Sequence, residues 1–65
     1  MKTKIKIHRA IHNITQAELA EKLGVTRQTI NAIEAGKYAP SVELALKMSK
    51  LFGVTVNEIF QLDEE

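Results

Sequence analysis

Residues 15–30 read TQAELAEKLGVTRQTI and contain two helix starts separated by a very short turn. The first four residues form a capping box, in which the Thr15 hydroxyl accepts from the third amide and Glu18 binds the cap amide. Gly24 predicts the end of this helix, in a left-handed conformation that other residues adopt at a cost. Thr26 then predicts the start of a second helix, so only Gly24 and Val25 lie between the two.

Small and apolar side chains in this stretch are spaced as two steeply crossing helices require. Ala20 is small where the two axes are expected to approach most closely, and Val25 fills the corner. The side chains expected to pack between the helices are Leu19, Leu23, Ile30 and Ile33. These positions predict a helix-turn-helix over about residues 15–35, with its second helix running from residue 27 to 35 and ending at Gly36.

Further start and stop signals divide the rest of the chain into three more helices. The first is expected over about residues 3–12, with Ile5, Ile7, His8 and Ile11 partly in helical register and Asn13 as its end. The fourth is expected to run from a Ser41 cap to Phe52, and the fifth from the capping box at residues 55–58 to about residue 60. The sequence therefore predicts a compact all-α domain of five helices over residues 1–65. The acidic tail, residues 61–65, either stays irregular or pairs as a short strand with residues 2–4.

Composition excludes several kinds of site. The chain has 65 residues and no cysteine, so disulfides, thiolate nucleophiles and cysteine-ligated zinc are not possible. That composition fits a reducing cytoplasm, where we expect the protein to reside. We expect no membrane span, because no stretch approaches the required length of about 18 apolar residues.

No enzymatic or cofactor chemistry is predicted. The chain has no glycine-rich phosphate loop and no convincing nucleophile–base pair, and its Ser and Thr residues fall at helix caps. His8 and His12 have the spacing of a helical metal pair, but that helix contains no Asp or Glu to complete a site. We therefore expect no metal, no cofactor and no small-molecule ligand.

Charge is distributed unevenly along the chain. The formal net charge of +1 rises to +4, nine basic against five acidic residues, when the three acids of residues 63–65 are set aside.

Polar side chains suited to nucleobases lie together on the outer face of the helix at residues 27–35. Arg can donate two hydrogen bonds to guanine, and Gln or Asn can pair with adenine. A solvated face, which is the alternative interpretation, would favour Glu and Lys. The exposed set is Arg27, Gln28, Asn31, Ala32 and Ala35, with Ala32 small enough to contact a thymine methyl.

Residues 15–30, together with residues 34–40 (EAGKYAP), resemble the lambdoid phage repressor and Cro family, also called XRE-like, and especially its short stand-alone members. The resemblance covers about residues 4–62. It implies a five-helix repressor-like fold and control of transcription, with repression as the expected sign. It also implies homodimeric binding to a pseudo-palindromic operator in double-stranded DNA.

The resemblance also implies roles for individual residues. It places Arg27, Gln28 and Asn31 at base edges. The side chains implied at phosphates are Thr15, Gln16, Thr29, Lys37 and Tyr38. An ion pair between Arg9 and Glu34 is implied as scaffold. The chain departs from the family pattern at Ala35 and Ala39, where relatives often carry polar groups, and at His8, where they place an apolar or aromatic residue.

Apolar side chains crowd the last dozen residues, and two interpretations stay open. They form a self-complementary dimer interface, expected at Val56, Ile59, Phe60 and Leu62, or they close the core of the monomer, and both can hold together. Two other functions also stay open. The same fold serves as an antitoxin or protein-interaction module, for which the chain offers no separate partner-binding segment. An RNA-binding module would need exposed aromatics, which are scarce.

Overall fold

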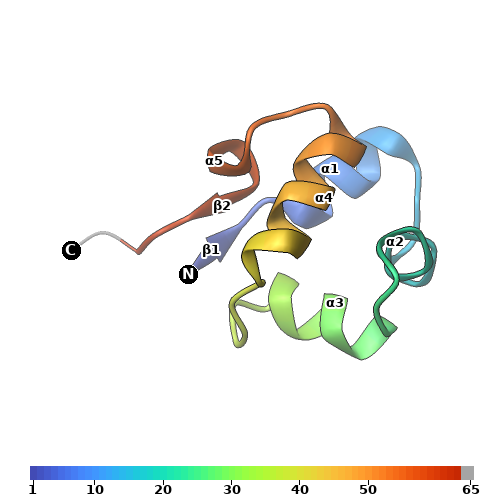
Figure 1. Ribbon diagram of the computed structural model, residues 1–65, viewed down its shortest axis with the longest axis horizontal. Helices are drawn as coiled ribbons and strands as arrows, with labels where there is room; N and C mark the ends of the chain where they lie inside the picture. The colour runs from blue at the N-terminus through green and yellow to red at the C-terminus, as the bar shows by residue number, and fades with distance from the viewer. Residues whose placement is uncertain (64–65) are drawn as a thin grey trace.

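Five short helices and a two-stranded ribbon make up residues 1–63, which are the residues described by a computed structural model (Figure 1). In chain order the elements are β1 (Lys2–Thr3), α1 (Ile5–His12), α2 (Gln16–Leu23), α3 (Arg27–Glu34), α4 (Val42–Phe52), α5 (Val56–Ile59) and β2 (Phe60–Gln61). The predicted all-helical fold and the pairing of the termini are both confirmed. Figure 1 shows α3 along one edge of the molecule.

Side-chain caps begin the helices of the central motif where the sequence predicts them. At α2 the Glu18 amide donates to the Thr15 hydroxyl at 3.1 Å, and the Thr15 amide donates to the Glu18 carboxylate at 2.9 Å. The Thr15 amide that donates to the carboxylate, followed by the Thr15 side chain, holds the pKa of Glu18 below its ordinary value. At the start of α3 the Thr26 hydroxyl accepts from the Thr29 amide, and at the start of α4 the Ser41 hydroxyl accepts from the Leu44 amide. Each cap satisfies an amide that would otherwise have no partner in the helix.

Left-handed residues end three helices and set the tight turn between α2 and α3. Asn13 ends α1 with φ 57°, Gly24 ends α2 with φ 74°, and Gly53 ends α4 with φ 69°. The Val25 amide binds the Ala20 carbonyl at 3.0 Å, which closes the turn directly after Gly24. The predicted helix-turn-helix is therefore present, with its second helix one residue shorter than expected.

A single apolar core joins the motif to the other helices. The predicted inner residues Leu19, Leu23, Ile30 and Ile33 are all buried, together with Ile5 of α1 and Met48 and Phe52 of α4. Ile7 and Ile11, which the sequence places only partly in helical register with Ile5, are exposed. In an α-helix successive residues are rotated by about 100°. With Ile5 on the inner side of α1, Arg9, four residues later, lies on the same side, and Ile7 faces outward. His8 is half-buried and stacks on Phe52, with ring centroids 5.5 Å apart.

The terminal ribbon fastens the N-terminus to the end of α3. β1 and β2 are antiparallel, with Lys2 opposite Gln61 and Thr3 opposite Phe60. The Thr3 hydroxyl donates to the Glu34 carbonyl at 3.2 Å. Gly36 has φ 74°, and a Cβ at this position would lie 2.6 Å from the Met1 carbonyl oxygen. The backbone therefore passes the end of α3 at a distance that only glycine allows.

The terminal amino group adds an ion pair beside the ribbon. It contacts the Asp63 carboxylate at 2.9 Å, and this contact lowers the pKa of Asp63. The expected strand forms at residues 60–61, while the last two residues of the expected acidic tail lie outside the described part of the chain.

Two residues expected at a dimer interface belong to the monomer core. Ile59 is fully buried and offers no surface to a second copy, whereas Phe60 is 8% exposed and keeps only a small part of its side chain at the surface. The physical reason is that α5 and β2 pack against the other helices, so their apolar side chains are used to complete the core of the monomer. The interpretation in which the C-terminal residues close the core is correct for this pair.

Candidate nucleic-acid interface

The outward face of α3 carries hydrogen-bonding side chains and is free of exposed carboxylates. Arg27, Gln28 and Asn31 are exposed and line a shallow hollow of about 230 Å³. Ala32 is half-buried beside them. Within residues 27–35 the carboxylate belongs to Glu34, whose side chain is only 10% exposed. This face therefore offers donors to a polyanion and sets no exposed acidic group against it.

An ion pair supports α3 from behind, as the family resemblance implied. The Arg9 Nε donates to Glu34 Oε2 at 2.6 Å, and a second guanidinium nitrogen, Nη2, donates to Oε1 at 3.2 Å. The third nitrogen, Nη1, donates to the Ile14 carbonyl at 3.2 Å. This bidentate geometry is the stronger form of a charge-assisted pair. It joins α1 to the last residue of α3 and to the segment that leads into α2.

Gln16 joins this ion pair to the outward face, which sequence reasoning missed. Its Nε2 donates to Glu34 Oε1 at 3.0 Å and to Asn31 Oδ1 at 3.4 Å. Both amide hydrogens thus have partners within the chain. The expected phosphate contact at Gln16 stays a prediction, and it would fall to the backbone amide, which has no intrahelical partner at the first position of a helix. Only the folded arrangement brings residues 16, 31 and 34 together, so spacing along the sequence carried no signal for this contact.

The start of α2 lies next to the start of α3, where several candidate phosphate ligands meet. A hollow of about 370 Å³ is lined by Thr15, Gln16 and Arg27, together with Arg9 and neighbouring residues of α1. The exposed Arg27 side chain and the positive end of the α2 dipole make this hollow suitable for an anion, while the Arg9 guanidinium is already bound to Glu34 and Ile14.

The remaining phosphate candidates occupy the flanks of α3. The Thr29 hydroxyl lies 3.0 Å from that of Thr26 at the start of the helix, so it also takes part in the cap. Lys37 and Tyr38 are exposed in the loop that follows the helix. Their contacts with phosphates stay predictions.

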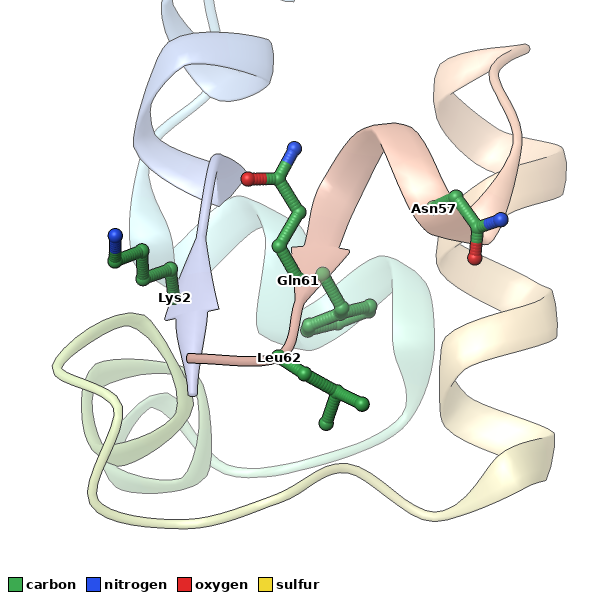
Figure 2. A pocket seen from close by; sticks show the side chains of 5 residues that line it. Lys2, Asn57, Gln61 and Leu62 are labelled. Carbon is green, nitrogen blue, oxygen red and sulfur yellow. The ribbon is translucent and has the colours of Figure 1, made fainter. Parts of the chain in front are cut away.

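A third hollow lies at the terminal ribbon. Its volume is about 480 Å³, and Lys2, Asn57, Phe60, Gln61 and Leu62 line it. Figure 2 shows it from close by, with Lys2 on β1, Asn57 on α5, and Gln61 and Leu62 at the end of the chain. Leu62 is 82% exposed, whereas Val56 is half-buried. Of the four residues expected at a dimer interface, Leu62 therefore presents the largest exposed apolar fraction.

A polar face on the second helix of a tight helix-turn-helix is the arrangement by which a DNA-binding module places a helix in the major groove. A family model for the helix-turn-helix matches residues 5–59, and the chain belongs to this family. Its fold and its exposed α3 are those of a DNA-binding transcriptional regulator. Within residues 1–63, the helices are too short and too polar to cross a membrane.

Curated relatives include both short and longer regulators. An uncharacterized HTH-type transcriptional regulator of Methanocaldococcus jannaschii is 57% identical over 65 residues, which cover all of this chain and 98% of that protein. The HTH-type transcriptional activator BcrR of Enterococcus faecalis is 42% identical over 80% of this chain and 26% of its own length. The cryptic phage CTXphi transcriptional repressor RstR of Vibrio cholerae is 33% identical over 88% of this chain and 51% of its own length.

A solved structure shares the fold. The hypothetical transcription factor NHTF from Neisseria superposes with a TM-score of 0.72 and 25% sequence identity, over 80% of this chain and 58% of that one. The likeness covers most of the chain and agrees with the family assignment.

Replacing Glu34 by Gln should lower the free energy of unfolding by about 3 kcal/mol, because it leaves the Arg9 charge uncompensated in a mostly buried site. The control is Glu43→Gln, which removes an exposed pair in which Lys47 Nζ lies 4.0 Å from Glu43 Oε1. That change should cost no more than about 0.5 kcal/mol. Urea unfolding measures both, and equal losses would contradict a supporting role for the Arg9–Glu34 pair.

Proposed function

We propose that the chain binds a pseudo-palindromic operator as a homodimer, with α3 in the major groove, and represses transcription at the promoter that overlaps it. The observation that carries the proposal is the exposed set Arg27, Gln28 and Asn31, held from behind by the Arg9–Glu34 pair. A helix that is held in place presents its donors to base edges at a smaller entropic cost than a mobile helix would.

Sequence reading and positioning would be divided between two groups of side chains. Arg27 and Gln28 would contact base edges, and Ala32 would lie against a thymine methyl. Contacts to phosphates would set the register without reading sequence. The residues proposed for phosphate contact are Thr15, Gln16, Thr29, Lys37 and Tyr38.

A homodimer would match the symmetry of such an operator. Two copies related by a two-fold axis would hold their α3 helices about 34 Å apart, one turn of DNA. The exposed Leu62 beside the ribbon hollow supports a self-complementary contact there. A domain of this size also buries little apolar surface by itself, so a second copy would add stability.

Repression is the sign of regulation that we propose. The similarity to the repressor RstR supports it, while the similarity to the activator BcrR shows that relatives of either sign exist. Repression by occupying a promoter requires only tight binding to DNA.

Arg27→Ala should weaken binding to the selected site by about 1–3 kcal/mol and relax the preference at one base pair in each half-site. Lys37→Ala, the control, should weaken binding to all sequences alike and reduce the salt dependence by about one charge. Titration of cognate and scrambled duplexes at several salt concentrations measures both effects. An equal loss on every sequence for Arg27→Ala would contradict its role in reading bases.

Leu62→Asp should shift the dimer towards monomer, because it places a charge in the proposed apolar contact. Leu46→Asp is the control, since Leu46 is an exposed leucine of α4 that does not line the ribbon hollow. Sedimentation at a range of concentrations compares the two. Unchanged association of the Leu62 variant would place the interface elsewhere.

A reporter promoter that overlaps the selected site should lose expression when the protein is supplied. Arg27→Ala should restore much of that expression, because weaker occupancy frees the promoter. A rise in expression with the unaltered protein would contradict repression and leave DNA binding intact.

A further inference from the structure

The hydrogen bonds behind α3 have a direction that charge imposes. A carboxylate only accepts hydrogen bonds. Glu34 therefore accepts both from the Arg9 guanidinium and from the Gln16 amide, whose Nε2 lies 3.0 Å from Oε1. This requirement fixes which end of the Gln16 amide faces inward: it is the nitrogen, and the oxygen points away from Glu34.

The same direction continues to Asn31. The second hydrogen on Gln16 Nε2 faces Asn31 Oδ1 at 3.4 Å. The reverse orientation of the Asn31 amide would set two donors against each other, which is unfavourable. Asn31 therefore turns its carbonyl towards Gln16 and keeps its NH2 group for a ligand at the exposed face.

We infer that Gln16 is a positioning residue that makes Asn31 a donor, so that Asn31 selects guanine or thymine. In the major groove guanine presents two neighbouring acceptors, O6 and N7, and thymine presents O4, whereas adenine presents the acceptor N7 beside an amino donor that would face the Asn31 NH2 group. Adenine is matched best by an amide that offers donor and acceptor side by side, and here the acceptor is already turned to Gln16. The inference rests on the proposed function and replaces the expectation that Asn31 pairs with adenine.

The arrangement also connects specificity to the scaffold. Asn31 itself is exposed, whereas the Arg9 and Glu34 side chains are 15% and 10% exposed. An exposed asparagine would otherwise choose either amide orientation according to the base. The mostly buried Glu34 carboxylate fixes the orientation of the Gln16 amide, and Gln16 in turn fixes the orientation of the Asn31 amide before any base is bound.

Binding-site selection from randomised duplexes tests the inference with the full chain. Asn31→Ala first identifies the base pair that Asn31 reads, as the position whose preference it relaxes. The unaltered protein should enrich guanine or thymine there. Gln16→Met, which keeps the length of the side chain and removes its donors, should raise the share of adenine at that position by about two- to tenfold, the worth of one hydrogen bond. Preferences at the other positions should stay as they are.

Glu21→Met is the control, since Glu21 is an exposed residue of the same helix that is hydrogen-bonded to neither Glu34 nor Asn31, and its replacement should change no preference. Enrichment of adenine at the Asn31 position by the unaltered protein, or a Gln16→Met profile that is weaker but unshifted, would overturn the inference alone. Failure of the unaltered protein to enrich any sequence would overturn the proposed function as well.

A second measurement covers the case in which Gln16→Met does not fold. In the free, unaltered protein the side-chain amide protons of Gln16 should exchange with water more slowly than those of Gln61. The reason is that both protons on Gln16 Nε2 are hydrogen-bonded within the protein. Equal exchange rates, measured by NMR, would overturn the inference.

Discussion

The carboxylate of Glu34 is the point on which the arrangement of the first three helices depends. It accepts from the Arg9 guanidinium of α1 and from the Gln16 amide of α2, while it is itself the last residue of α3. A mostly buried carboxylate requires such partners, because an unpaired charge in this position would be costly. One side chain thereby sets the position of α3 relative to both neighbouring helices.

The backbone at the end of α3 is held a second time by the N-terminus. The Thr3 hydroxyl binds the Glu34 carbonyl, and Gly36 passes close to the Met1 carbonyl. The start of α3 is fixed by the two-residue turn after α2 and by the Thr26 cap. With both ends held and the inner side packed in the core, only the polar outer face of the helix is left for a ligand.

Local chemistry explains why much of the fold was predictable from the sequence. Caps at Thr15, Thr26 and Ser41 and the left-handed ends at Asn13 and Gly24 depend on neighbours within a few residues. The burial of Ile59 and Phe60 and the exposure of Ile7 depend on which helices meet, which spacing alone does not give. The Arg9–Glu34 pair came from family resemblance. Its extension to Gln16 and Asn31 joins residues from separate helices and appears only in three dimensions.

The most direct test of the central claim is an NMR titration of the labelled protein with a selected duplex. The account predicts that amide signals of residues 27–32 shift most, together with those at the start of α2, while those of α4 stay nearly unchanged. Shifts concentrated on α4 or the terminal ribbon, with residues 27–32 silent, would contradict the claim that the fold exists to present α3 to DNA.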